Sequence, residues 1–272
     1  MEEAAAAVVR LGNVHMTGAI RMVSLSRGHD PRDFVLFAFG GAGPLHAVAL
    51  ARELGIPEVL VPARPGLTNA LGCLVADLRQ DRVNTLNRRV DGLDMAEVRA
   101  VLEAQRDGAL AAMAEERTEV EGVVVLHAAD MQFRGQTHLI RVPLPRADVS
   151  AGEVQALFEA AYFKRFQVRL PEIRAVLVNL VTSVVGRRNA FPLSSLLDGA
   201  ARRGTLDEAL IGRRPLYADG GWREAAVYSR EALPADARIE GPAVVQQVDA
   251  TTVIEPGAVA AVDAIGNLRI RA

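Results

Sequence analysis

The sequence predicts an α/β fold that begins with parallel strands covered by helices and ends in a β-rich part. Two observations lead to this prediction. Apolar strand-like segments alternate with helix-like segments between residues 34 and 78, an order typical of parallel strands connected by helices. Short strand-like segments separated by Asp-Gly, Pro-Gly and Gly-Asn turns then fill residues 213–272, which is typical of a small β-rich unit.

Composition and charge limit the classes of partner. The chain has 272 residues, of which 50% are hydrophobic, enough for one large or two modest globular domains. A net charge of −2 and an aromatic content of 4% give no basis for a nucleic-acid partner. No stretch approaches the roughly 18 apolar residues of a membrane span, and the N-terminus lacks the basic region of a secretory signal. We therefore expect no nucleic acid and no membrane as partner.

The single cysteine also bears on the compartment. Cys73 excludes an internal disulfide framework, because no second cysteine is present, and this suits the reducing cytoplasm. Cys73 lies in the apolar stretch LGCLVADL. We expect it to be a buried small hydrophobic residue rather than a nucleophile.

The first element is a long amphipathic helix over residues 2–27, since apolar residues recur there at roughly helical spacing. Gly28 and Pro31 end it. The alternating segments that follow are a strand over residues 34–39, a helix over 43–54, a strand over 58–61 and a helix over 68–78.

Two short parallel strands cannot form a sheet by themselves, because a parallel sheet is buried on both faces. Either the strand-like residues 81–86 and later strands extend the same sheet, or the missing strands lie on another polypeptide. The sequence leaves both alternatives open.

The middle of the chain predicts an α+β region. A strongly helical composition covers residues 94–116, and strand-like segments follow on both sides of Gly135. Ser150 is an N-cap for a helix over residues 150–167, with Glu153 at the capping-box position. A strand-like segment ends near residue 186. The predicted division is a first segment, an α+β region, a loop or linker, and a β-rich unit, at residues 1–90, 91–186, 187–212 and 213–272.

The glycine turn between the first strand and its helix is the main candidate site. It reads Gly40-Gly41-Ala42-Gly43-Pro44-Leu45-His46. A glycine turn that leads into a helix exposes several backbone N–H groups beside the positive end of the helix dipole, which suits a phosphate. Pro44 fits the first helical turn. A tight connection without a ligand remains an equal alternative.

A dinucleotide-binding fingerprint is the next alternative, and it is incomplete. His46 stands where a third Gly or Ala would allow close helix packing, and the next strand ends in Pro62 rather than in an acid. Arg64 alone could serve the 2′-phosphate of NADP. His46 could act as an acid or base, but a histidine in a first helical turn more often forms a hydrogen bond or packs. The five histidines show no metal-ligand spacing, so we assign no metal ligands.

Several segments together resemble the hydantoinase A/oxoprolinase family. They are RGHDPRDFVLFAFGGAGPLHAVALARELGIPEVLVPARPGLTNALGCLVADLRQD, MQFRGQTHLIRVPLP and IEGPAVVQQVDATTVIEPG, closing with GNLRI, and they correspond to the C-terminal part of the family's members. Those include ATP-dependent hydantoinases, 5-oxoprolinases and the ATP-using subunits of acetone and acetophenone carboxylases. The resemblance implies a partial actin-like ATPase lobe followed by a β-rich α+β C-terminal domain, with ATP and Mg²⁺ bound between two lobes in the complete enzyme.

The resemblance also implies site residues. Gly40, Gly41, Ala42 and Gly43 match the family's second-lobe nucleotide motif, which Pro44, Leu45 and His46 complete. Asn69 belongs with Pro65-Gly66 and Gly72 to the neighbouring hinge region. Arg134-Gly135-Gln136 and Asp249–Thr252 belong to the C-terminal part, and we assign them no chemical step.

The chain lacks one family feature, the Asp-x-Gly-Gly-Thr phosphate loop of an N-terminal lobe. Phosphoryl transfer needs the γ-phosphate and its Mg²⁺ held from both sides. We therefore expect that this chain alone does not hydrolyse ATP. Metal-dependent turnover of about 1 s⁻¹ would contradict that expectation.

The resemblance implies three partners: the missing N-terminal ATPase lobe, a hydantoinase B-type subunit, and a cyclic amide or ketone substrate. The chain is then a C-terminal segment or split subunit of an ATP-dependent enzyme that hydrolyses cyclic amides or carboxylates ketones. The alternative is a noncatalytic docking module or a truncated remnant, which needs only a stable complex with a partner.

Overall fold

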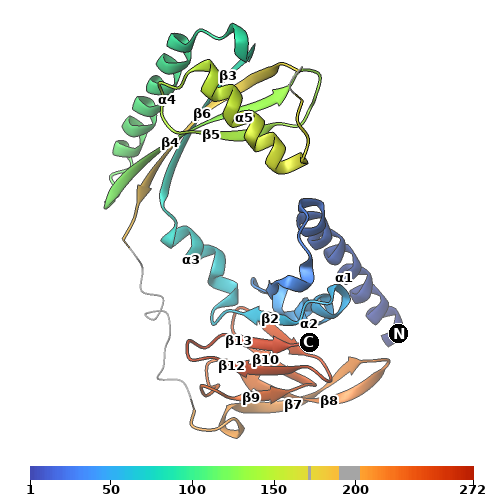
Figure 1. The fold of residues 1–272 in the computed structure, drawn as a ribbon. Coiled ribbons are helices and arrows are strands. Elements are labelled where there is room, and N and C mark those ends of the chain that lie inside the picture. Colours follow the sequence, from blue (N-terminus) through green and yellow to red (C-terminus); the bar gives the residue numbers. More distant parts are fainter. Residues whose placement is uncertain (171–172, 190–202) are drawn as a thin grey trace. The chain divides into compact units, whose positions relative to one another are not determined.

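The structure is a computed structural model that describes residues 1–170, 173–189 and 203–272. Its contacts divide the chain into two compact units (Figure 1). Unit 1 joins Met1–Leu74 to Phe191–Ala272, and unit 2 comprises Val75–Ala190. Unit 1 is therefore built from two parts of the chain that are distant in sequence, and unit 2 lies between them in the sequence.

The N-terminal part of unit 1 follows the predicted alternation of helix and strand. Its elements are α1 (Glu2–Ser24), β1 (Val35–Phe37), α2 (Gly43–Leu54), β2 (Glu58–Val61) and α3 (Thr68–Val75). The α2 and β2 bounds agree with the prediction, while α1, β1 and α3 are shorter than expected. Gly55 ends α2 with a φ of +68°, a left-handed conformation that glycine adopts without strain.

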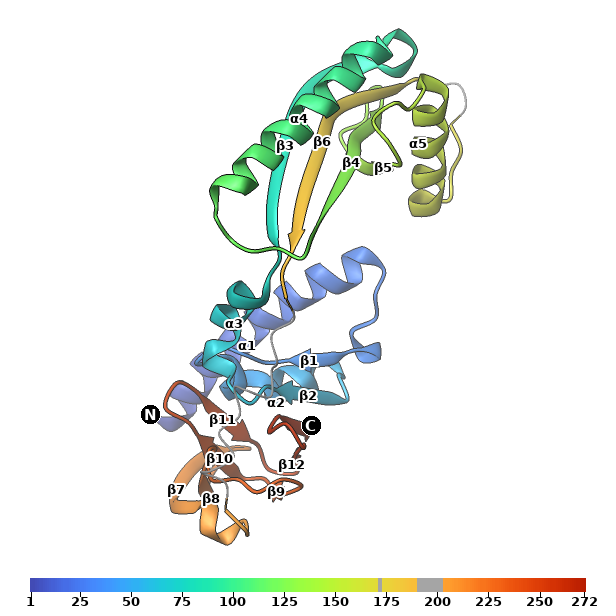
Figure 2. The same cartoon turned by 90° about the vertical axis from the view of Figure 1, so that its left-hand side faces the viewer.

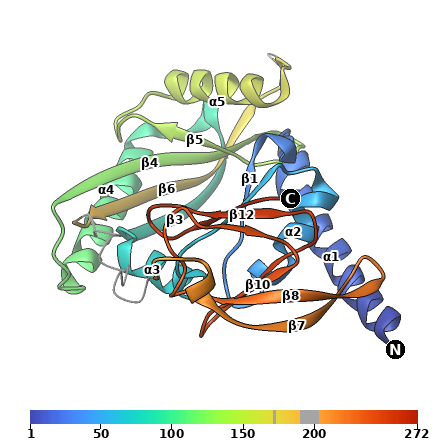
Figure 3. The same ribbon diagram turned by 90° about the horizontal axis from the view of Figure 1, so that it is seen from below.

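Residues 203–272, the described C-terminal part of unit 1, contribute seven strands. They are β7 (Leu210–Ala218), β8 (Gly221–Ser229), β9 (Arg238–Glu240), β10 (Ala243–Gln246), β11 (Thr251–Ile254), β12 (Val259–Val262) and β13 (Leu268–Arg271). Strands β7 and β8 run side by side as a hairpin (Figure 3). They belong to a four-stranded sheet in the order β11-β10-β8-β7.

The other sheet of unit 1 bears on the first of the two alternatives for the incomplete sheet. Its order is β1-β2-β13-β12-β9, in which β1 and β2 are parallel and β13 pairs antiparallel with β2. Strands from the end of the chain therefore extend the sheet. The predicted strand at residues 81–86 does not take part, because it belongs to a sheet of unit 2. Among the described residues, β1 pairs with β2 only.

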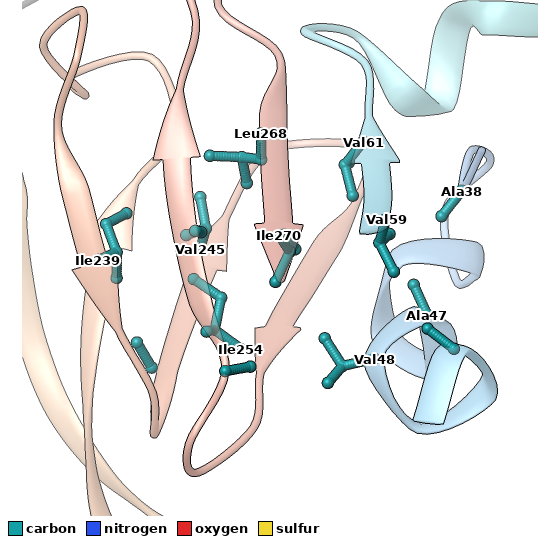
Figure 4. Packing of buried hydrophobic residues seen from close by; sticks show 14 of the residues in the cluster. Ala38, Ala47, Val48, Val59, Val61, Ile239, Val245, Ile254, Leu268 and Ile270 are labelled. Atoms are coloured by element: carbon teal, nitrogen blue, oxygen red, sulfur yellow. The ribbon is translucent and has the colours of Figure 1, made fainter. Parts of the chain in front are cut away.

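The core of unit 1 lies between α2 and strands of both sheets. Val48 of α2, Val59 of β2, Val245 of β10, Ile254 of β11 and Ile270 of β13 are buried in one hydrophobic cluster. Figure 4 shows these side chains facing one another across the layers. The two parts of the chain that form unit 1 are thus held together by apolar packing as well as by the pairing of β2 with β13.

Unit 2 is a two-layer α+β unit. Its elements are β3 (Leu78–Arg89), α4 (Met95–Glu115), β4 (Gly122–Phe133), β5 (Ile140–Leu144), α5 (Ala151–Phe166) and β6 (Ala175–Arg187). The sheet has the order β3-β6-β4-β5 and every neighbouring pair is antiparallel. Helices α4 and α5 lie beside this sheet (Figure 2). Both contribute to one hydrophobic cluster with the sheet, through Leu102 of α4 and Phe158 of α5.

The predicted capping box is present at the start of α5. Ser150 accepts a hydrogen bond from the Glu153 N–H at 3.2 Å, and the Glu153 carboxylate accepts one from the Ser150 N–H at 2.8 Å. The Arg146 guanidinium also lies 2.6 Å from the Glu153 carboxylate. The hydrogen bond from the Ser150 N–H and this ion pair lower the pKa of Glu153 to about 2.

Unit 2 is expected to lose stability in acid as Glu153 takes up a proton. A carboxyl group whose pKa is lowered in the folded state takes up its proton at a lower pH there than in the unfolded state. Its contribution to the free energy of unfolding is therefore present above about pH 4.5 and is lost towards pH 2. Thermal unfolding of wild type and Glu153→Gln between pH 6 and pH 2.5 measures this. The variant should show a smaller decrease in melting temperature over that range. Equal decreases in the two proteins would contradict the prediction.

The boundaries of the two compact units differ from those of the four predicted segments. β3 lies within the predicted segment 1–90 but pairs with β6 in unit 2, and β13 of the segment 213–272 pairs with β2. The cause is long-range strand pairing, which periodicity along the sequence does not reveal. Of the predicted linker 187–212, residues 190–202 lie outside the described residues, and β7 begins at Leu210.

One prediction about burial is wrong. Cys73 is exposed, and no residue of α3 is buried. In α1 only Thr17 is buried, whereas apolar residues such as Val8, Leu11 and Val23 are exposed. Ile20 of α1 packs against the hydrophobic cluster of unit 1, whereas the other apolar residues of α1 and the residues of α3 stay largely exposed.

Candidate functional site

The glycine turn joins β1 to α2 and leaves the first turn of the helix open to solvent. Gly40 has a φ of +80°, and its N–H donates a hydrogen bond to the Pro65 carbonyl at 2.7 Å. Ala42 precedes α2 without forming a side-chain cap, and Gly41 and Ala42 are exposed. The start of α2 therefore presents backbone N–H groups that no side chain caps, an arrangement suited to an anion.

The remaining residues of the motif fix the helix. Pro44 is buried in the first turn of α2, where its missing N–H costs nothing. His46 is half-buried, and its Nδ1 lies 2.9 Å from Asn13 Oδ1 of α1. This hydrogen bond joins α1 to α2 and supports the interpretation of His46 as a hydrogen-bonding residue rather than an acid or base.

A second segment, residues 61–68, lies beside the turn and is held by the C-terminal part. The buried Arg230 guanidinium donates to three carbonyl oxygens at 2.8–3.3 Å, those of Val61, Pro62 and Gly266. The Gln247 side chain donates to the Ala63 carbonyl at 3.1 Å, and the Ala63 N–H donates to Asn267 Oδ1 at 3.0 Å. Burial lowers the pKa of Arg230 to about 10, so its guanidinium stays charged at neutral pH.

The connection between β10 and β11 brings a third segment to the turn. The Thr251 N–H donates to the Gly41 carbonyl at 3.4 Å. A Cβ atom on Gly41 would lie 3.2 Å from the backbone oxygen of Asp249. A Cβ atom on Gly66 would lie 2.6 Å from the Cγ atom of Asp249 and even closer to the Oδ2 atom of Asp249. The Asp249 side chain therefore occupies space that a Cβ at residue 66 would fill, and its backbone oxygen lies close against Gly41.

Asp249 also carries the one buried side-chain oxygen or nitrogen atom without a hydrogen-bond partner in the described part of the chain, its Oδ2. The family resemblance implied a place in the site region for Asp249 and for Gly66, but no common role. No sequence signal places them together, because they are far apart in the chain. The Pro65-Gly66 pair was the available hint that a close approach occurs there.

The structure therefore brings Gly40–Pro44 together with Pro65-Gly66. Asn69 is exposed at the second position of α3, and the hydrogen bonds of the described residues include none between Asn69 and the turn. Arg64, the residue on which the NADP alternative rested, lies 3.6 Å from Glu231 in an ion pair.

A separate groove of about 1000 Å³ lies in unit 1 between α1 and the β7–β8 hairpin. Its lining includes Arg10, Asn13, Glu53, Trp222 and Glu255 and none of the predicted nucleotide-binding residues. Over residues 1–170, 173–189 and 203–272, no three His, Cys, Asp or Glu side chains cluster as metal ligands would. Among the helices described, none has the length and apolar character needed to cross a membrane.

Comparison with protein-family models gives matches over nearly the whole chain. The model of hydantoinase/oxoprolinase proteins matches residues 1–82, and the model of the hydantoinase/oxoprolinase C-terminal domain matches residues 92–271. The second match alone covers well over half of the chain.

Individual relatives agree with these matches. The chain is 33% identical to an uncharacterised protein of Methanocaldococcus jannaschii over 99% of its own length and 38% of the relative's. It is 28% identical to the alpha subunit of caprolactamase from Pseudomonas jessenii and to the beta subunit of acetone carboxylase from Xanthobacter autotrophicus, in each case over 94% of this chain. It spans 38% and 37% of those two subunits.

Solved structures show the same fold. A nucleotide-free acetone carboxylase, described as carrying out ATP-dependent carboxylation, superposes with a TM-score of 0.74 at 25% identity. The ATP-dependent caprolactamase of Pseudomonas jessenii superposes with a TM-score of 0.73, also at 25% identity. Each match covers 99% of this chain and 40% of the solved chain.

Proposed function

Because the chain belongs to the hydantoinase/oxoprolinase family, we propose that it provides one side of an ATP site in an enzyme that hydrolyses a cyclic amide or carboxylates a ketone. Two of its relatives are named for ATP-dependent reactions, caprolactam hydrolysis and acetone carboxylation. The chain spans about two-fifths of their length, and the proposal is therefore limited to one side of the site.

The observation that supports this function is the open N-terminus of α2 behind the glycine turn. Gly41, Ala42 and Gly43 offer backbone N–H groups, while Gly40 shapes the turn and its own N–H donates to the Pro65 carbonyl. Gly41 and Ala42 are exposed and no side chain caps the helix, so a ligand has room to approach. Pro65-Gly66 lies beside the same turn, because the Pro65 carbonyl accepts the Gly40 N–H, and Asn69 is included on the family resemblance. These residues would bind and orient the nucleotide.

The bound ATP would supply the phosphoryl group that makes an amide or enolate oxygen of the substrate reactive. This chain offers no group of carboxylates for Mg²⁺ within the described residues, so the metal and the γ-phosphate would be held by the N-terminal lobe. We further propose that a hydantoinase B-type subunit acts on the activated substrate, and that the assembly works in the cytoplasm.

An interaction surface for that lobe is available on unit 1. One edge of β1 pairs with no described strand, and Phe34, Val35 and Phe37 beside it are 46–51% exposed. The apolar residues of α1 are exposed as well. This surface supports the split-subunit proposal and is equally what a noncatalytic docking module would need.

Replacing Gly40 by alanine is expected to weaken ATP binding at least tenfold, because a residue with Cβ resists the φ of +80° and shifts the turn. Gly28→Ala is the matched control. Gly28 also has a φ of +80°, also has no neighbour within 4 Å of a Cβ, and lies outside the turn. Both variants should therefore lose similar stability, and only Gly40→Ala should lose affinity.

The measurement is calorimetric titration of the purified 272-residue chain with MgATP, together with an assay of phosphate release. Binding by wild type and by Gly28→Ala, without turnover by either, is the expected result. No binding by wild type, or equal binding by the two glycine variants, would refute the proposed site. Turnover of about 1 s⁻¹ would refute the need for a second lobe.

A further inference from the structure

Asp249 bears a buried carboxylate oxygen that accepts no hydrogen bond from the described residues. Its Oδ2 is buried, and no described group donates a hydrogen bond to it. A buried acceptor without a donor costs about 1–3 kcal/mol, and more when it is charged. A residue with that cost and no structural partner is a candidate for a partner that the chain alone does not contain.

The surrounding backbone is shaped to admit this side chain. Gly66 leaves the space that the Asp249 side chain occupies. A Cβ atom on residue 66 would lie 2.8 Å from the Cβ of Asp249 and 2.6 Å from its Cγ, and would also clash with its Oδ2. Gly41 similarly leaves room for the Asp249 backbone oxygen, at 3.2 Å from a Cβ. Two separate glycines thus accommodate one aspartate at the glycine turn.

The sign of the charge limits which part of a nucleotide could meet Asp249. A carboxylate repels phosphate groups, so the phosphates belong at the N-terminus of α2 and not beside Asp249. The nucleoside carries neutral donors instead, namely the ribose hydroxyls and the amino group of the base, and a carboxylate accepts from either. Asp249 is only partly buried as a residue, and because its Oδ2 is enclosed, the carboxylate would meet a ligand by turning away from Gly66.

We propose that Asp249 recognises the nucleoside part of the ATP bound at the glycine turn, by accepting a hydrogen bond from a ribose hydroxyl or from the base amino group. This inference rests on the proposed function. It assigns the β10–β11 connection a direct role in binding, in addition to its pairing with the turn through Thr251.

The test combines Asp249→Ala with nucleotide analogues, using the 272-residue chain. Asp249→Ala should bind ATP at least tenfold more weakly than wild type, because the acceptor is gone. Its melting temperature without nucleotide should equal or exceed that of wild type, because an unpartnered buried charge is gone too. Asp236→Asn, a change at an exposed aspartate of the same unit, should alter neither quantity.

Titrations with 2′-deoxy-ATP, 3′-deoxy-ATP and ITP identify the donor. Wild type should bind at least one of the three more weakly than ATP, and Asp249→Ala should no longer distinguish that analogue from ATP. A weakened deoxy analogue assigns the donor to the ribose, and weakened ITP assigns it to the base.

Three results would overturn the inference. These are ATP affinity of Asp249→Ala within twofold of wild type, a lower melting temperature of that variant, and equal binding of ATP and all three analogues by wild type. In each of them wild type still binds ATP, so the proposed function stands. Absence of ATP binding by wild type would refute both the proposed function and this inference.

Discussion

Replacing Phe158 by alanine is expected to lower the free energy of unfolding of unit 2 by about 3–5 kcal/mol. Phe158 of α5 is fully buried, and its ring lies 4.8 Å from the Phe133 ring of β4 in an edge-to-face arrangement. The Tyr162 ring packs against Phe133 as well, at 4.7 Å. Alanine would leave a cavity at the centre of this aromatic cluster, where α5 meets the sheet.

Phe163→Ala is the matched control for this prediction. Phe163 lies on the same helix, so the change in helix propensity is the same, but its side chain is 37% exposed. Urea denaturation followed by circular dichroism should show a loss below about 1 kcal/mol for the control. Similar losses in the two variants would mean that α5 does not pack against β4 through Phe158.

Replacing Gly241 by alanine is expected to lower the free energy of unfolding of unit 1 by about 3 kcal/mol. A Cβ atom at this position would overlap the Glu255 carbonyl and lie 2.7 Å from the Ile254 carbonyl oxygen. Both obstacles are backbone, which cannot rotate away as a side chain can. The β10–β11 hairpin would have to move, and with it the connection that carries Asp249.

Gly221→Ala provides the comparison, since a Cβ at Gly221 meets nothing within 4 Å. Thermal unfolding of both variants measures the difference. The control should melt within a few degrees of wild type, whereas Gly241→Ala should melt well below it. If Gly241→Ala is as stable as wild type, then the approach of residues 241 and 255 in the structure is incorrect.

Local elements of this fold could be predicted well because their signals lie within single segments. Ser150 and Glu153 identify the start of α5 by chemistry that operates over three residues, and Gly55 marks the end of α2. The glycine turn, with its uncapped helix, was likewise predicted from adjacent residues. Its placement between β1 and α2 is confirmed, and its binding role remains a prediction.

Features that depend on residues far apart in the chain could not be predicted in this way. The pairing of β13 with β2 joins residues about 200 positions apart, and no periodicity encodes which strands pair. The approach of Asp249 to Gly66 has the same origin. Cys73 was wrongly predicted to be buried because an apolar sequence shows that a surface needs covering, but not whether the same unit covers it.

The position of β13 has a consequence for biosynthesis. β13 lies between β2 and β12, so the five-stranded sheet is interrupted at its centre until residues 268–271 leave the ribosome. Unit 2 contains all of its own strands and can fold during translation, while Met1–Leu74 must wait with β1 and β2 unpaired on one side. Until then the edge of β2 that later pairs with β13 stays open, and a chaperone or an assembly partner could bind it.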